Sequence, residues 1–167
     1  MRQRMNGSLG LFLMMAALLP ALTGCGPQAE VVVDDTEMLP FNNLGVGPTA
    51  TLTDTTEVLL YTPEAWERYR SQLHSVGPFK PVDFTQEMVA LVAVPEETGG
   101  YSVEVESVER ADSVIVVSYV LLTPKRDCVT PMGRAVPYQA VAVRRAEGPV
   151  RFERRTASFP CTVDDRL

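Results

Sequence analysis

The chain has 167 residues, of which 46% are hydrophobic, and a formal net charge of −6. Its length suits one ordinary domain and is too short for two large ones. An acidic surface argues against a nucleic acid as the binding partner.

Residues 1–24 have the arrangement that is typical of a secretory signal peptide. Arg2 and Arg4 form a basic start, an apolar run extends from Leu9 to Leu22, and small residues precede Cys25. The apolar run is too short for a membrane-spanning helix. We therefore expect this segment to be removed, which leaves the mature chain with a charge of −6 − 2 = −8.

The sequence Leu22-Thr23-Gly24-Cys25 resembles the bacterial lipobox. This resemblance implies thioether lipidation of Cys25, cleavage before it and an acylated new N-terminus. An ordinary signal peptide that happens to contain Cys25 is the alternative. Several acyl chains would hold the protein at a membrane, because one chain alone binds only marginally. Gly26 at the next position fits export to the outer membrane, so we expect a lipid-anchored protein of the bacterial cell envelope, on its periplasmic or surface face.

Residues 25–36 have no clear hydrophobic period and contain Pro27, Asp34 and Asp35, which predicts a lipidated tether. The β-branched run Val31-Val32-Val33 leaves a short strand as the alternative. We expect one domain over residues 37–160 and a C-terminal tail over 161–167. At the start of this domain, the glycine-rich stretch Leu39–Thr53 predicts an irregular segment packed on the domain edge.

One helix is predicted, directly after a short apolar strand. Thr62 can cap its N-terminus and Pro63 suits its first position. Gly77-Pro78 is expected to end it. Its apolar stripe consists of Trp66, Tyr69 and Leu73. A tryptophan on such a stripe predicts a core anchor, because the side chain buries a large area.

The hydrophobic pattern predicts about six strands, mostly antiparallel. Two of them, Met88–Val94 and Val114–Leu122, are apolar at both parities and should therefore lie inside the fold. The others are Glu57–Tyr61, Tyr101–Glu106, Tyr138–Val143 and Val150–Arg155. The fold class is thus α+β, with a mainly antiparallel sheet or open barrel and one amphipathic helix.

The most strongly patterned stretch is Thr98-Gly99-Gly100-Tyr101 and the hairpin that follows it. The two glycines predict positive φ or a close backbone approach. The residues Arg110-Ala111-Asp112-Ser113 supply turn chemistry between the hairpin strands. A long connection from Pro124 to Pro137 follows. The glycine turn is interpreted first as a tight turn, with partner binding as the alternative.

A disulfide between Cys128 and Cys161 is predicted. These two are the only cysteines besides Cys25, and an exported protein is exposed to an oxidising environment. In the chain-entropy model, closing a loop of this length stabilises the fold by about 3 to 4 kcal/mol.

The order of several short elements resembles the PrcB-like domain family, over roughly residues 39–155. The elements are Leu59 to Trp66, Pro81 to Phe84, Met88 to Val94, Thr98 to Val103 and Pro137 to Val141. The family is named for the lipoprotein subunit that stabilises a secreted chymotrypsin-like protease complex in a spirochaete. The resemblance implies an exported, often lipidated, non-enzymatic α+β domain. The Cys128 and Cys161 pair is not part of the family pattern.

The sequence contains few residues and no motif that would support catalysis. The chain has one histidine, His74, and no zinc-binding spacing, serine elbow or glycine-rich nucleotide loop. Cys128 with His74 and Asp83 is the best nucleophilic combination, but an oxidised Cys128 would be inert. We expect no enzyme activity, no cofactor and no metal. The pairs Arg144-Arg145 and Arg154-Arg155 are interpreted as solvated strand faces, with a role in docking as the alternative.

These observations predict a lipid-anchored protein-binding module of the cell envelope, and the resemblance to the PrcB-like family implies that it assists or stabilises a secreted or surface protease complex. The alternatives are a small thiol hydrolase that uses Cys128 and His74, and a structural envelope lipoprotein without a dedicated partner. The expected partners are the membrane, through Cys25, and a protein. The candidate partner-binding residues are Thr98, Gly99, Gly100, Tyr101, Pro131, Arg134 and Tyr138.

Overall fold

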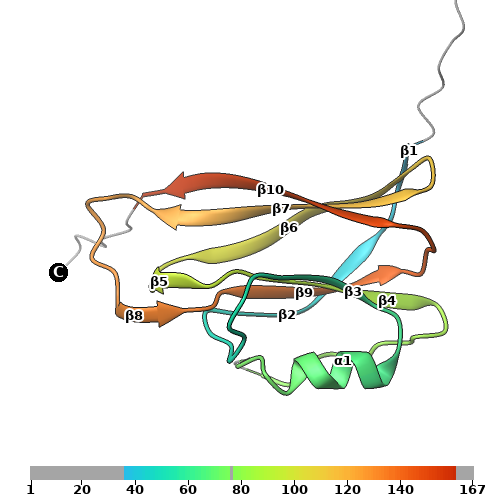
Figure 1. Ribbon diagram of the computed structural model, residues 1–167, viewed down its shortest axis with the longest axis horizontal. Coiled ribbons are helices and arrows are strands. Elements are labelled where there is room, and N and C mark those ends of the chain that lie inside the picture. Colours follow the sequence, from blue (N-terminus) through green and yellow to red (C-terminus); the bar gives the residue numbers. More distant parts are fainter. Residues whose placement is uncertain (1–35, 76, 161–167) are drawn as a thin grey trace, which may run out of the picture. The chain divides into compact units, whose positions relative to one another are not determined.

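The structure, a computed structural model, describes residues 36–75 and 77–160 (Figure 1). The chain divides into two compact units, Met1–Val32 and Val33–Leu167, and all described residues belong to the second. The predicted signal peptide, Cys25, the tether up to residue 35 and the tail with Cys161 lie outside the described residues. Among the residues that are described, no helix is long and apolar enough to cross a membrane.

Two four-stranded sheets form most of this unit. The first has the order β1-β6-β7-β10 and consists of β1 (Thr36–Met38), β6 (Ser102–Ala111), β7 (Val114–Pro124) and β10 (Val150–Phe159). The second has the order β2-β9-β4-β3 and consists of β2 (Phe41–Gly47), β9 (Tyr138–Arg144), β4 (Glu87–Ala93) and β3 (Thr56–Leu60). A two-stranded ribbon of β5 (Glu96–Thr98) and β8 (Met132–Ala135) and one helix, α1 (Pro63–Arg70), complete it.

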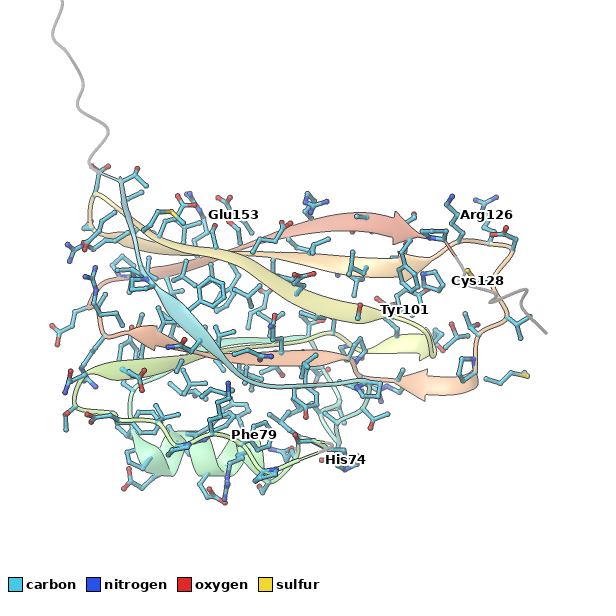
Figure 2. The ribbon with its side chains drawn as sticks, turned by 180° about the vertical axis from the view of Figure 1, so that it is seen from behind. His74, Phe79, Tyr101, Arg126, Cys128 and Glu153 are labelled. Carbon is cyan, nitrogen blue, oxygen red and sulfur yellow. The ribbon has the colours of Figure 1, made fainter. Side chains whose placement is uncertain are left out.

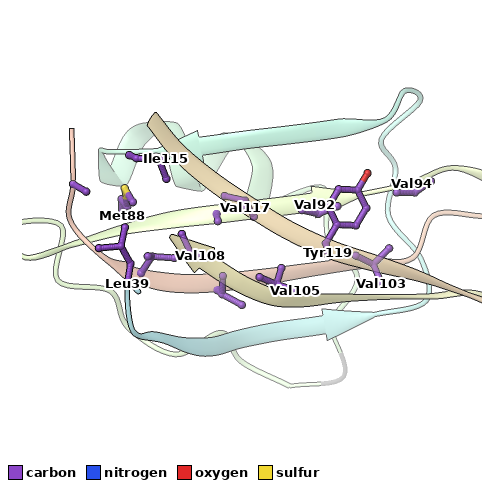
Figure 3. Close-up of a cluster of buried hydrophobic side chains, with 14 of the residues drawn as sticks. Leu39, Met88, Val92, Val94, Val103, Val105, Val108, Ile115, Val117 and Tyr119 are labelled. Atoms are coloured by element: carbon purple, nitrogen blue, oxygen red, sulfur yellow. The ribbon is translucent and has the colours of Figure 1, made fainter. Parts of the chain in front are cut away.

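The sheets and the helix lie in three layers, with the second sheet in the middle (Figure 1). One hydrophobic cluster fills the space between the two sheets, with Met88, Val92, Val117 and Tyr119 among its buried members (Figure 3). A second cluster lies between the middle sheet and α1. Because β4 is covered on both faces, all its residues after the first are buried. This confirms the interior strand predicted at Met88–Val94.

Helix α1 begins as predicted and ends earlier. The Thr62 hydroxyl accepts a hydrogen bond from the Ala65 backbone N–H at 3.2 Å, and Pro63 is the first helical residue. Trp66 is 6% exposed and meets Phe79 edge to face, with ring centroids 5.3 Å apart. The predicted end at Gly77-Pro78 is wrong, because the helix stops at Arg70.

Strand β7 is apolar on both faces although its sheet is covered on one face only. Val116 and Val120 point away from the core, yet they are 7% and 2% exposed. Val120 lies opposite Glu104 on one side and Arg155 on the other. Arg155 reaches across to Glu106 in an ion pair, with Nε and Oε2 3.2 Å apart. The stems of these long side chains therefore cover the outward valines, as amphipathic side chains commonly do.

The expectation of about six strands in one sheet or open barrel is corrected to ten strands in open sheets within residues 36–75 and 77–160. The four strands that were not predicted are β1, β2, β5 and β8. The irregular segment expected at Leu39–Thr53, from its interleaved asparagines and glycines, contains strand β2, which has a bulge between Asn43 and Gly45. A Cβ atom on Gly45 would lie 2.4 Å from the Phe79 ring. Glycine is therefore required at this position by the packing of Phe79 and not by a turn.

One strand departs from the expected antiparallel pairing. Strand β10 pairs with β7 in parallel, from Val150 opposite Ile115 to Phe159 opposite Pro124. Parallel neighbours need a crossover, and here the crossover consists of β8 and β9, which lie outside the first sheet. The hairpin turn was predicted correctly: Ala111 pairs with Val114, and Asp112 between them has φ of 54°.

Candidate functional site

The ribbon of β5 and β8 extends the middle sheet at one end. The ladder between β4 and β9 continues past a break at Pro95 and Pro137, where the Val94 N–H donates to the Pro137 carbonyl oxygen at 3.0 Å. Beyond the ribbon the chain crosses between the sheets twice. Residues 98–101 lead from the middle sheet to β6, and residues 124–131 lead back from β7 to β8.

The glycine pair lies where these two crossings touch. The Gly99 N–H donates to the Pro131 carbonyl oxygen at 2.9 Å, and a Cβ on Gly99 would be 3.0 Å from the Pro131 side chain. Gly100 has φ of +90°, and a Cβ there would be 3.1 Å from the Thr130 methyl group. Only glycine adopts this conformation without strain. The predicted tight turn is therefore a corner between sheets, held against the second crossing.

The second crossing and the first residue of β8 carry the two most exposed large hydrophobic side chains in the described part of the chain. Val129 is 101% exposed and Met132 is 97% exposed, with exposed Pro131 between them. We call the six exposed residues Lys125, Arg126, Val129, Pro131, Met132 and Arg134 the tip. Figure 2 shows Arg126 and Cys128 at the end of the molecule that the tip occupies.

The cations of the tip have no carboxylate partner among the described residues. Arg134 instead donates from Nη2 to the Thr53 carbonyl oxygen. Most arginines elsewhere are ion-paired, namely Arg70, Arg110, Arg144, Arg151, Arg154 and Arg155. The tip is thus a basic and apolar surface on a chain whose net charge is −6.

The arginine pairs that sequence offered for docking are engaged within the fold. Arg144 and Arg110 both contact the Glu37 carboxylate, and the hydrogen bond from Arg144 is the main reason that the pKa of Glu37 is lowered. Arg145 donates to the carbonyl oxygens of Tyr61 at 3.1 Å and Phe84 at 2.9 Å. These contacts favour a structural role for Arg144 and Arg145 over a role in docking a partner.

A polar cluster ties the ribbon to β10. Arg154 lies 3.8 Å from the carboxylate of Glu96 in β5. Nearby, the buried Tyr119 donates its hydroxyl to Glu57, and burial followed by this hydrogen bond raises the pKa of Tyr119. The ribbon therefore rests on both sheets, which gives the tip a fixed base.

The candidate partner-binding residues divide into three groups. Thr98, Gly99 and Tyr101 are partly buried, and Tyr101 packs against the core between the sheets. Gly100, Pro131 and Arg134 are exposed, as a binding role requires. Tyr138 is a correction: it is 0% exposed, and its ring packs against the backbone at Gly47, so its side chain faces no partner.

Val129 and Met132 were missed by sequence reasoning. The signal was a valine and a methionine within a connection of charged residues, prolines and glycine, outside any strand pattern. The predicted strand-free connection gave no reason to bury either side chain.

The combination of Cys128, His74 and Asp83 is not brought together. Asp83 precedes β4, whereas Cys128 lies in the crossing beyond the other end of that strand, and β4 has seven residues, or about 20 Å. His74 and Cys128 lie in different layers (Figure 2). Asp83 is also occupied locally, because Thr85 donates to its carboxylate from the backbone at 3.0 Å and from the hydroxyl at 2.6 Å. Within the described ranges, no cluster of three or more His, Cys, Asp or Glu side chains could hold a metal ion.

The described strands bring the chain close to the predicted disulfide. The Lys125 N–H donates to the Phe159 carbonyl oxygen at 3.3 Å, and the Cys128 N–H donates to the Lys125 carbonyl oxygen at 3.0 Å. Cys161 follows Phe159 by two residues and lies outside the described part. The pairing of Cys128 with Cys161 stays a prediction, which this proximity supports.

The chain was compared with known protein families, curated proteins and solved structures. Residues 88–144 match the family model described as PrcB C-terminal. The match confirms the predicted resemblance and is shorter than the expected range of 39–155. No curated protein and no solved structure gave a significant match.

The PrcB C-terminal match contains the features that build the tip. It begins in β4 and ends with β9, so it includes both crossings, the glycine corner and the ribbon. Strands β1, β2, β3 and β10 and the helix lie outside it. The matched part is therefore the central ladder together with the connection that bears the exposed side chains.

Proposed function

We propose that this protein is a lipid-anchored binding module of the bacterial cell envelope, and that its tip contacts a protein partner in a protease complex. The observation that carries the proposal is the full exposure of Val129 and Met132 on a crossing fixed by the glycine corner. Clustered exposed hydrophobic side chains commonly mark interaction sites. The PrcB C-terminal match supports association with a protease complex.

The position of the tip fits a tethered module. Strand β1, where the described chain begins, pairs with the last residues of β6, with Thr36 opposite Ala111. The glycine corner precedes the first residue of β6, Ser102. Ten residues of strand span about 30 Å, so the two ends of the unit are well separated, as Figure 1 shows for β1 and β8. The tip and the first described residues therefore lie at opposite ends of the described unit.

The test replaces the exposed hydrophobic side chains and measures the partner. Cells that lack the native gene would produce the full chain as Val129→Ser with Met132→Ser, or as Val46→Ser with Met38→Ser. The control pair has the same residue types on β2 and β1, with Val46 47% and Met38 59% exposed. We expect the tip variant to lose at least about tenfold of the co-purifying protease subunit and of envelope protease activity, because apolar contacts at an interface centre dominate affinity.

Two further readouts keep the result interpretable. Both variants should unfold at the same denaturant midpoint as the parent, because all four side chains are exposed. A Cys25→Ser variant should lose label from a palmitate analogue and move from the membrane fraction to the soluble fraction. If the tip variant keeps the same partner and activity as the control pair, the protein-binding role of the tip is wrong, and a structural envelope lipoprotein becomes the better account.

A further inference from the structure

The charged residues beside Val129 and Met132 indicate which kind of partner surface the tip could bind. Lys125, Arg126 and Arg134 contribute three positive charges to the connection, and Asp127 contributes one negative charge, so its net charge is 3 − 1 = +2. The whole chain has a net charge of −6. The tip therefore differs in sign from the rest of the molecule.

The unpaired state of these cations distinguishes them from most others in the described part of the chain. Six arginines there contact a carboxylate at 3.8 Å or less. No such contact is made by Lys125, Arg126 or Arg134 within the described ranges. Lys125 and Arg126 are therefore available for carboxylates of another molecule, whereas Arg134 donates from Nη2 to the Thr53 carbonyl oxygen and offers only its other N–H groups. Arginine binds carboxylates with two parallel hydrogen bonds.

We propose that the tip binds an apolar pocket that is bordered by aspartate or glutamate side chains on a folded protein partner. This inference rests on the proposed function and adds the chemistry of the partner. Val129 and Met132 enter the pocket, while Lys125, Arg126 and Arg134 contact its acidic border. Charged borders of this kind speed association and select the partner more than they raise affinity.

The net charge favours a protein over an anionic membrane as the source of the acidic groups. The whole chain carries a charge of −6, so anionic lipid would repel the body of the molecule even where the tip attracts it. A folded protein can instead present a few acidic side chains to the tip alone.

Photo-crosslinking of the full chain in the cell envelope tests the inference. A photoreactive p-benzoylphenylalanine replaces Val129 in one strain and Val46, on β2, in a control strain. Envelope fractions are irradiated at 50 and 500 mM NaCl, and adducts are identified by mass. We expect a protein adduct at position 129 only, with a yield that falls about fivefold or more at the higher salt because ionic contacts are screened.

Charge variants of the chain that carries the photoreactive residue at position 129 test whether the tip cations contact acidic groups, as distinct from a general effect of net charge. Lys125→Glu with Arg126→Glu should lower the adduct yield about tenfold at 50 mM NaCl. Arg68→Glu changes another exposed arginine without an ion pair in the described part, on α1, and should leave the yield within about twofold. Asp127→Asn should raise it, because that change removes the one acidic group of the connection.

The possible failures point to different conclusions. An adduct at position 129 that is unaffected by salt and by the charge reversal would overturn the acidic pocket and leave the protein-binding function standing. The absence of an adduct above the level at position 46 would overturn both proposals. An adduct to phospholipid in place of protein would identify the tip as a membrane contact, and would also overturn both.

Discussion

At the scale of single residues, three glycines show two different reasons why a position requires glycine: a positive φ, and a neighbouring atom that leaves no room for a Cβ. Gly100 combines φ of +90° with a close neighbour, since a Cβ would be 3.1 Å from the Thr130 methyl group. Gly99 has the close neighbour without positive φ, and Gly133 has φ of +107° with open space around it. The sequence indicated that the glycine pair was special, but it could not show what each glycine faces.

Alanine substitutions at these three positions should lower the free energy of unfolding by different amounts, according to whether backbone strain, a close contact or both are involved. We expect Gly133→Ala to lower the free energy of unfolding by about 1 to 2 kcal/mol, from backbone strain alone. Gly100→Ala should cost about 2 to 3 kcal/mol, because strain and contact add. Gly99→Ala should fall below Gly100→Ala, since only the Pro131 contact is affected. Chemical denaturation measures these losses. Equal losses in the free energy of unfolding for Gly100→Ala and Gly133→Ala would mean that Thr130 can move away from the added methyl group at no cost.

At the scale of elements, β1 is held to both sheets by one carboxylate. It pairs with β6 over three residues, and its central residue Glu37 contacts Arg110 of β6 and Arg144 of β9. Arg144 and Arg110 lower the pKa of Glu37 from its ordinary value near 4.5, with the Arg144 hydrogen bond the largest cause. A three-residue strand has few backbone bonds, so these exposed ion pairs add to its attachment.

The lowered pKa predicts how the attachment of β1 depends on pH. A carboxylate whose pKa is depressed in the folded state contributes stability above its unfolded pKa and loses it as the pH falls through the folded pKa. The loss in unfolding midpoint caused by Glu37→Gln should therefore be present at pH 7 and shrink progressively below about pH 4.5. Thermal unfolding between pH 3 and pH 7 measures this. A difference that stays constant over that range would show that Glu37 acts through packing and not through its charge.

Elements with strong periodicity were predictable, whereas elements defined by their neighbours were not. The strands at β3, β4, β6, β7, β9 and β10 follow from runs of apolar residues, and the helix start follows from Thr62 and Pro63. Strand β2 contains Gly45 because the Phe79 ring occupies the space of a side chain, and such a contact between distant residues has no local signature. The same limit applies to the tip, because the exposure of Val129 depends on how two crossings pack.

At the scale of the whole molecule, the predicted disulfide between Cys128 and Cys161 would tie the segment after β10 to the crossing that carries part of the tip. The prediction is that intact protein contains a bond between Cys128 and Cys161, visible as a loss of two hydrogen masses without reductant. Because the bond closes a long loop, Cys161→Ser should lower the free energy of unfolding by about 3 to 4 kcal/mol. Reduction of the parent protein should have a similar effect and leave the variant unchanged. Free thiols at both positions in exported protein would exclude the bond.

Strand β10 is the last strand in the described part of the chain and is synthesised after its neighbour β7, which sets the order in which the first sheet can be completed. Until residues 150–159 have emerged, β7 is an edge of its sheet, and it is apolar on both faces. An unpaired edge of this kind is a template for association with other chains. A chain that is cut short before β10 should therefore aggregate rather than merely lose some stability. Quality control of this protein would then depend on β10 more than on the ladder between β4 and β9.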